Sequence, residues 1–453
     1  MPQFKATLLT SLAALGLLFA PSLSAAEPKI VDVTKAGVLG DGTTLNTTSL
    51  QKAIDDLAAA GGGTLEFPAG RYLTGTVQLK SNLTLQLDEG ATILGSTNAA
   101  DYRNLDPFID GSGNPMGHAL IVAVEARHVA IEGKGTIDGQ GKVLASHQKP
   151  FSMRPFLIRW VRCSDIAVRG VHLTNPGAWT LHFSQSKNAV VDGLTIRTRD
   201  QRLRNNDGVD IDSSENIHVT NCDIISGDDA IVIKSTSGTP SRDIVASDCR
   251  LSTRTNAIKL GTESYGGFEN ITVSRCTVTN TDMAGIALYE VDGASLSKVN
   301  ISDVTMDGVS VPISIRLGAR LKTFRAGDQP KPASTLSDVT IKNVTAKNVK
   351  VVGILINGIP GHPVENVTLE NVQLEVPGGG TAEDAKIQLP EKEKAYPEFS
   401  MFGKKIPASG IYIRHVKGLT FKDVKVTPLQ PDARPATVVI DAENVTPADL
   451  ASH

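Results

Sequence analysis

Short segments in which apolar and polar residues alternate recur through most of the chain. They span residues 215–219, 242–245, 269–273, 365–369 and 417–421. Such alternation is typical of a strand with one buried face, and helical periodicity is almost absent after residue 70. Because the strands recur at a nearly constant spacing with no helices between them, they predict a coil that stacks on itself. We therefore predict an all-β protein that folds as a single-stranded parallel β-helix.

A second repeat can be aligned from one coil to the next. Its copies begin at Asp207, Asp229, Asn256, Ala284 and Val311, so each follows the last by about one coil. Since strand side chains alternate between the two faces, each copy should place two apolar residues inward. The predicted inward ladders are Val209, Ile231, Ile258, Ile286 and Ile313, and Ile211, Ile233, Leu260, Leu288 and Ile315.

The residues between these ladders should face outward in columns, about 4.8 Å apart per coil. One column is Asp210, Val232, Lys259, Ala287 and Ser314, and the next is Asp212, Lys234, Gly261, Tyr289 and Arg316. Columns of this kind suit the floor of a groove. We interpret Asp210, Asp212 and Lys234 as solvated outward positions.

The ends and interruptions of the repeat predict the rest of the architecture. Residues 48–57 have apolar positions at helical spacing, which favours a helix that caps the open end of the coil. The insertions 320–335 and 377–409 break the repeat, and we expect both to be loops that rim one face. Within the second insertion, residues 396–402 concentrate aromatic side chains that either wall the groove or pack beneath the loop.

The N-terminal segment 1–26 has the order of a secretory signal. Lys5 is followed by a largely apolar run from Ala6 to Ala20, and small residues precede Glu27. The apolar run is shorter than the roughly 20 residues that cross a bilayer. We expect residues 1–26 to be a cleaved signal peptide, residues 27–453 to form one catalytic β-helix domain, and the protein to be secreted or periplasmic, with no membrane partner.

Charge and cysteine content narrow the class of protein. The 45 basic and 48 acidic residues leave no excess of positive charge, which disfavours a nucleic-acid partner. The four cysteines are too few for a disulfide scaffold. Cys222, Cys249 and Cys276 are evenly spaced, one to a coil, which indicates stacked small side chains rather than a zinc site, with a disulfide as the alternative.

Three carboxylates converge in this alignment. Asp207 and Asp229 occupy the same position in neighbouring coils, and Asp228 lies beside them, just after Gly227. Like charges this close resist simultaneous ionisation, so one group should keep its proton while another is an anion. Hydrolysis of a glycosidic bond needs that division between an acid and a base. The alternatives are turn-capping carboxylates or an ion site, calcium above all.

At these residues the chain resembles the family 28 glycoside hydrolases, the polygalacturonase-like enzymes, whose motifs are Asn-Thr-Asp, Gly/Gln-Asp-Asp, Gly-His-Gly and Arg-Ile-Lys. The first motif appears as Asn205-Asn206-Asp207 and the second as Gly227-Asp228-Asp229, with further similarity at residues 133–139 and 175–182. The resemblance implies a right-handed parallel β-helix. It also implies inverting hydrolysis with Asp228 as general acid and with Asp207 and Asp229 as the base that activates water.

The other two motifs depart from the family. Asn256 stands where the family has histidine, and Ala287 and Tyr289 replace the two cations that hold a galacturonate carboxylate. Lys259 and Arg316, one coil to either side of this position, are candidate replacements for an acidic sugar. A neutral sugar stacked on Tyr289 is the alternative.

We place Asn205, Asn256, Lys259, Tyr289 and Arg316 among the candidate substrate-binding residues. Trp179 and His182 join them because they lie one coil before the carboxylates and face a flanking subsite.

The sequence thus predicts a metal-independent, cofactor-free hydrolase of pectin-type polysaccharide, galacturonan or rhamnogalacturonan. We expect a polysaccharide or oligosaccharide as its only partner and a monomer in solution. A polysaccharide lyase on the same fold and a non-catalytic glycan-binding β-helix are the alternatives. A lyase would release an unsaturated sugar, and a binder would gain little from adjacent like charges.

Overall fold

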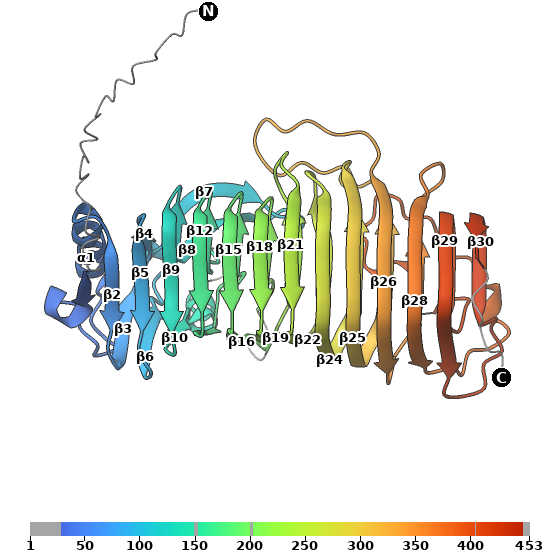
Figure 1. Cartoon of the computed structure of the whole chain (residues 1–453), viewed down its shortest axis with the longest axis horizontal. Helices are drawn as coiled ribbons and strands as arrows, with labels where there is room; N and C mark the ends of the chain where they lie inside the picture. The colour runs from blue at the N-terminus through green and yellow to red at the C-terminus, as the bar shows by residue number, and fades with distance from the viewer. Residues whose placement is uncertain (1–28, 149–152, 200–202, 404, 447–453) are drawn as a thin grey trace, which may run out of the picture.

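The structure, a computed structural model, describes residues 29–148, 153–199, 203–403 and 405–446, so the predicted signal peptide lies outside the described residues. Strands stack one beside the next along a single axis from β1 to β30 (Figure 1). Nearly all neighbouring strands pair in parallel. The predicted all-β parallel β-helix is confirmed.

Each full coil contributes to three lines of paired strands, which we call the first, second and third sheets. The first sheet comprises β4 (Val77–Leu79), β8 (Pro115–Val124), β11 (Phe156–Val161), β14 (Leu181–Ser184), β17 (Val209–Asp212), β20 (Ile231–Ser235), β23 (Ile258–Ser264) and β27 (Ile354–Asn357). The second comprises β1 (Ile30–Asp32), β2 (Gly63–Phe67), β5 (Leu83–Leu87), β9 (Arg127–Gly133), β12 (Ser164–Arg169), β15 (Lys187–Asp192), β18 (Glu215–Thr220) and β21 (Ser241–Ser247). The third comprises β3 (Gly70–Thr74), β6 (Ala91–Gly95), β10 (Thr136–Asp138), β13 (His172–Thr174), β16 (Thr195–Arg197), β19 (Asp223–Ser226) and β22 (Arg250–Thr253).

Later strands are longer and bend from one sheet into the next. These are β24 (Phe268–Glu290), β25 (Ser295–Leu317), β26 (Thr335–Lys347), β28 (Val364–Val376), β29 (Ile411–Pro428) and β30 (Thr437–Val445). The strand β7 (Arg103–Ile109) differs from the others because it pairs antiparallel with β8. Short 3₁₀ turns lie at Val33–Ala36, Ala99–Asp101, Asp384–Lys386 and Phe399–Phe402.

The inward ladders form the core as predicted. Val209 pairs with Ile231, Ile231 with Ile258, Ile258 with Ile286 and Ile286 with Ile313. All five side chains are at most 2% exposed. This register places the apolar residues at the same position in successive coils, so the core is continuous along the axis.

A helix closes the N-terminal end. The helix α1 (Thr47–Ala59) buries Leu50, Ala53, Ile54 and Leu57 against the first coils. Figure 1 shows it across the end of the stack where β2 and β4 lie, which confirms the predicted cap. A second, shorter helix, α2 (Gly141–Ser146), interrupts the coil after β10.

The outward columns are not solvated, which corrects the interpretation of Asp210, Asp212 and Lys234. Both aspartates are 0% exposed and Lys234 is 5% exposed. The reason is that distant loops cross the first sheet. Gly111, beyond β7, donates a backbone hydrogen bond to Glu263, and the insertion 320–335 is tied to the same region through Lys322 and the carbonyl of Gly111.

The cysteines lie in the core of the stack. Cys163, Cys222, Cys249 and Cys276 are buried free thiols, which confirms the stacked-side-chain interpretation and excludes the disulfide alternative. Within the described residues, no helix is long and apolar enough to cross a bilayer.

Candidate active site

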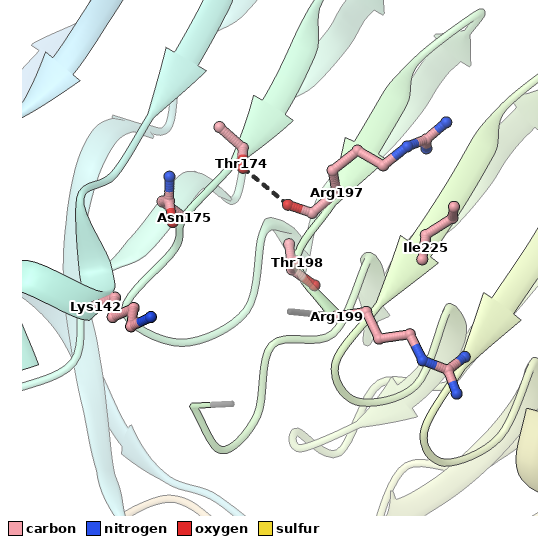
Figure 2. A pocket seen from close by; sticks show the side chains of 7 residues that line it. All are labelled: Lys142, Thr174, Asn175, Arg197, Thr198, Arg199 and Ile225. Atoms are coloured by element: carbon pink, nitrogen blue, oxygen red, sulfur yellow. Dashed lines mark hydrogen bonds between the residues drawn. The ribbon is translucent and has the colours of Figure 1, made fainter. Parts of the chain in front are cut away.

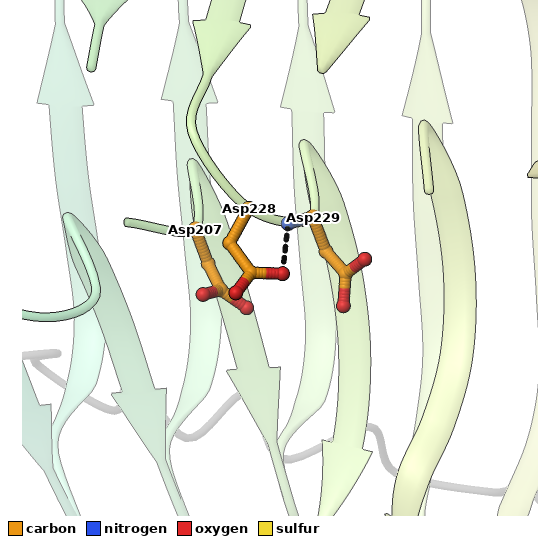
Figure 3. A group of neighbouring side chains, drawn as sticks. All are labelled: Asp207, Asp228 and Asp229. Carbon is orange, nitrogen blue, oxygen red and sulfur yellow. Dashed lines mark hydrogen bonds between the residues drawn. The ribbon is translucent and has the colours of Figure 1, made fainter. Parts of the chain in front are cut away.

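The coil register brings the predicted carboxylates together. The backbone N–H of Gly208 donates to the carbonyl of Asp229, so Asp207 and Asp229 lie side by side, each two residues before a strand of the first sheet. Figure 3 shows the side chain of Asp228 between the other two. One carboxylate oxygen from each of the three lies within 4.8 Å of the others. We call Asp207, Asp228 and Asp229 the carboxylate cluster.

Asp228 is the most open member and is held at both oxygens. Its Oδ1 accepts hydrogen bonds from the backbone N–H of Asp229 and the hydroxyl of Thr255, both at 3.0 Å, and its Oδ2 accepts one from the N–H of Asn205 at 3.2 Å. Burial and the neighbouring negative charge of Asp229 raise its pKa to about 6. Asp228 can therefore hold a proton in mildly acidic solution.

Asp229 lies in the opposite electrostatic environment. Burial acts to raise its pKa, but the charges of Lys259 and Lys234 outweigh that effect and lower the pKa below its usual value. The ammonium of Lys259 lies 2.9 Å from Oδ2, and Asn256 donates to Oδ1 from both its backbone N–H and its side-chain amide. Below about pH 6, Asp229 is therefore an anion beside a protonated Asp228.

Asp207 shares a buried cation with two other carboxylates. The ammonium of Lys234 lies 3.7 Å from Asp207, 3.7 Å from Asp210 and 3.3 Å from Glu263. Burial, reinforced by the charges of Asp210 and Asp228, raises the pKa of Asp207 well above its usual value. Among the described residues, Oδ1 of Asp207 has no hydrogen-bond partner, so its capacity to bond a substrate or a water molecule is unused.

Glu398 joins the site from the insertion 377–409. Its Oε1 lies 3.0 Å from both the Lys259 ammonium and the Asn256 side-chain nitrogen, and its Oε2 is 3.5 Å from the Tyr289 hydroxyl. The ring of Tyr396, in the same insertion, lies 5.6 Å from the Lys259 nitrogen. This segment therefore walls the site, although Phe402 packs in a separate apolar cluster beneath it.

The structure brings together only part of the predicted binding set. Asn205, Asn256 and Lys259 touch the carboxylate cluster directly. Tyr289 is 0% exposed and lies behind them, with its ring centroid 6.0 Å from the Lys259 nitrogen and its hydroxyl 3.5 Å from Glu398. No open aromatic face remains on Tyr289 for a sugar. Arg316 lies apart from the cluster, because its guanidinium donates to the backbone carbonyls of Gly358 and Glu391.

Trp179 and His182 are also covered. The Trp179 side chain is 1% exposed and packs with Phe108 and Phe156, while the Lys234 ammonium lies 4.5 Å from its ring centroid. Burial lowers the pKa of His182 to about 4, so the ring is neutral near neutral pH. Trp179 lies under the Lys234 ammonium and His182 packs against Trp179, so neither presents a surface to a flanking subsite.

Sequence reasoning missed several residues that shape the site. Lys234, interpreted as solvated, lies 3.7 Å from Asp207, and Thr255 hydrogen-bonds Asp228 from within the third motif. Arg154 donates to the Asn205 side chain at 2.8 Å. Arg154 and Glu398 lie outside the repeats, so the repeat alignment could not find them. The concentration of aromatic residues at 396–402 was the one sequence feature that pointed to the loop of Glu398.

The cluster also satisfies the simplest requirement of a metal site, three carboxylate oxygens close together. Calcium usually takes six to eight oxygen ligands at about 2.3–2.6 Å. Here the ammonium groups of Lys234 and Lys259 lie against two of the three carboxylates. Positive charges in those positions oppose a divalent cation, so the residues present do not fit a metal well.

A basic pocket of about 380 Å³ adjoins the cluster on the third-sheet side. It is lined by Lys142, Thr174, Asn175, Arg197, Thr198, Arg199 and Ile225 (Figure 2). The Thr198 hydroxyl donates to the carbonyl of Asn206 and accepts from the N–H of Gly227, which joins the pocket to the turns that hold Asp207 and Asp228. The Arg199 guanidinium is already bonded to Ser252 and Asn280.

The structure is therefore a parallel β-helix with a cluster of three carboxylates beside its first sheet. Residues 60–395 match the model of the glycosyl hydrolases family 28, and the chain belongs to that family.

Relatives and solved structures agree with the family match. A probable polygalacturonase of Vitis vinifera is 32% identical over 266 residues, which cover 54% of this chain and 54% of that protein. An endo-polygalacturonase of Pectobacterium carotovorum subsp. carotovorum is 29% identical, covering 69% of this chain and 82% of that one. The structure of a Yersinia enterocolitica family 28 exopolygalacturonase superimposes with a TM-score of 0.74 at 23% identity, over 93% of this chain and 79% of the other. The chain spans about half the length of the first relatives it matches.

Proposed function

We propose that this protein is a glycoside hydrolase that cleaves pectin-type polysaccharide, galacturonan or rhamnogalacturonan, by acid–base hydrolysis with inversion. The observation that carries the proposal is that Asp207, Asp228 and Asp229 each place one carboxylate oxygen within 4.8 Å of the others, with the Lys259 ammonium 2.9 Å from Asp229. The pKa values agree with this arrangement, since that of Asp228 is raised to about 6 and that of Asp229 is lowered. The family match and the polygalacturonase relatives support the substrate class.

Asp228 is the general acid in this proposal. Its protonated carboxyl donates the proton to the glycosidic oxygen as the bond to the anomeric carbon breaks. It suits this role because it is the most exposed of the three carboxylates and because its raised pKa lets it keep a proton at pH values where Asp229 is already ionised.

Asp229 is the base that receives a proton from the attacking water, and Asp207 orients that water. An ionised carboxylate has about four acceptor sites, of which Asn256 and Lys259 occupy three, so one remains for a water hydrogen. Asp207, with its raised pKa, is a poor nucleophile but can hydrogen-bond the same water through its unpartnered Oδ1.

We propose inversion on the basis of these roles. Retaining glycosidases have carboxyl groups about 5–5.5 Å apart, and inverting ones about 6.5–9.5 Å apart. In this structure one oxygen from each of the three carboxylates lies within 4.8 Å of the others, which is closer than the inverting range. A retaining mechanism, however, needs a carboxylate that is free to attack the sugar. Lys259 and Asn256 hold Asp229 at both oxygens, and the raised pKa of Asp207 makes it a weak nucleophile, which favours attack by water.

The test is a panel of homogalacturonan, rhamnogalacturonan and aryl glycosides, read by new reducing ends and product size. Wild-type protein should cleave at least one pectin-type substrate, and Asp228→Asn should lower turnover about 10²–10⁴-fold while the fold is retained. Proton NMR of the first product should show the inverted anomer. Unchanged turnover in Asp228→Asn would remove this cluster from the reaction.

We also propose that the protein is exported, because residues 1–26 have the order of a cleaved signal. Terminal sequencing of the protein from periplasm or medium should begin at Glu27.

A further inference from the structure

The site contains a carboxylate-binding arrangement that is already filled by the protein itself. The Lys259 ammonium, the Asn256 side-chain amide and the Tyr289 hydroxyl all converge on Glu398. The Glu398 side chain is only 10% exposed, and the three groups that bind it come from two successive coils beyond Asp229. An acid sugar would need the same donors for its own carboxylate.

We infer that Glu398 excludes a uronate from the subsite on the Lys259 side of the carboxylate cluster, so that this subsite takes a neutral sugar. The inference deepens the proposed function and rests on it. It names Glu398 as a specificity-determining residue, supplied by the insertion 377–409 rather than by the repeats.

The charges at this position support the inference. Lys259 has a single positive charge, and Asp229 and Glu398 lie 2.9 and 3.0 Å from its nitrogen. A third carboxylate would meet two anions and one shared cation, in a buried environment where like charges repel strongly. A hydroxymethyl or methyl group in its place adds no charge.

The other buried cations beside these carboxylates are already paired with acidic side chains. Lys234 is shared by three carboxylates, and the Arg320 guanidinium is paired with Asp292. Arg154 lies on the other side of Asp228, where it bonds Asn205. Glu398 therefore excludes a uronate only from the Lys259 side of the cluster, and a uronate can still bind on the Arg154 side.

The experiment compares two ligands that share one skeleton and differ in charge, trigalacturonate and its fully methyl-esterified form. Binding is measured by calorimetry in the full-length Asp228→Asn protein, so that the ligand is not consumed, with and without Glu398→Gln. The glutamine keeps the shape of Glu398 and removes its charge. Glu383→Gln, at an exposed glutamate of the same insertion, is the matched control.

With Glu398 present, the esterified ligand should bind at least about tenfold more tightly than trigalacturonate, because the negative charge of Glu398 repels a carboxylate brought against it. Glu398→Gln should reduce that preference at least about fivefold, by the loss of one repulsive charge, and Glu383→Gln should leave it unchanged. A ligand preference that Glu398→Gln does not shift toward trigalacturonate overturns the inference.

The same proteins separate this inference from the proposed function. If the wild-type protein cleaves a pectin-type substrate but Glu398→Gln does not change the preference between the two ligands, only the inference is overturned. Failure of a folded protein to bind either ligand or cleave any substrate of the panel overturns both.

Discussion

The hydroxyl of Thr255 donates a hydrogen bond of 3.0 Å to Oδ1 of Asp228. This contact joins the third motif, where the family histidine is absent, to the proposed general acid. A hydrogen bond to the ionised carboxylate favours the charged form and so lowers the pKa of Asp228.

Replacing Thr255 with valine should therefore raise the pKa of Asp228. The alkaline limb of kcat/KM against pH should move to higher pH, because Asp228 keeps its proton longer. Thr255→Ser retains a hydroxyl and is the matched control, whose limb should stay near that of the wild type. An alkaline limb that is the same in Thr255→Val as in wild type would show that this hydrogen bond does not tune the acid.

The wild-type pH profile itself should be bell-shaped and acidic. Asp228 must be protonated, so kcat/KM should fall as pH rises through about 6. Asp229 must be ionised, and because its pKa is lowered, the acidic limb should lie below the ordinary aspartate value of about 3.9. The measurement is kcat/KM on one soluble oligosaccharide across pH 3 to 8. A rate that still rises above pH 7 would contradict Asp228 as the acid.

The buried cation Lys234 should be important for stability. Lys234→Met leaves Asp207, Asp210 and Glu263 buried without their shared positive charge, and breaking a buried ion pair typically costs about 3–5 kcal/mol. The thermal midpoint followed by circular dichroism should fall clearly at pH 8. The deficit should shrink at pH 5, since carboxylates without a cation take up protons more readily.

A matched exposed lysine checks this result. Lys422 pairs with Glu370 at 3.7 Å on the surface, and such pairs contribute less than about 1 kcal/mol. Lys422→Met should therefore leave the midpoint almost unchanged at both pH values. If the thermal midpoint falls equally in Lys234→Met and Lys422→Met, the buried carboxylates around Lys234 are not the cause of the lost stability.

A chelator should leave the activity intact. Lys234 and Lys259 already neutralise the cluster, so EDTA should not change the rate of release of reducing ends. The products should lack the ultraviolet absorption of the unsaturated sugars that a lyase releases. Loss of activity in EDTA that calcium restores would favour the calcium-site alternative instead.

The repeats by themselves determined the fold and the position of the chemistry. Alternating apolar residues spaced at one coil length place Val209, Ile231 and Ile258 in one ladder, and the same register sets Asp207 beside Asp229. The prediction is possible because each coil contacts only the coils before and after it. The spacing of the repeat along the sequence therefore shows which residues lie side by side in space. The helix at the N-terminal end was predictable for the same reason, since an open stack needs a cap.

The environment of the cluster was decided by tertiary structure alone. The alternation of a strand says that Asp210 and Lys234 point outward, but not that residues near Gly111 and the insertions cover them. Glu398 lies 139 residues from Lys259 along the chain and belongs to no repeat, so no period predicts their contact. Burial and charge pairing set the pKa values that separate acid from base, and both depend on those long-range contacts.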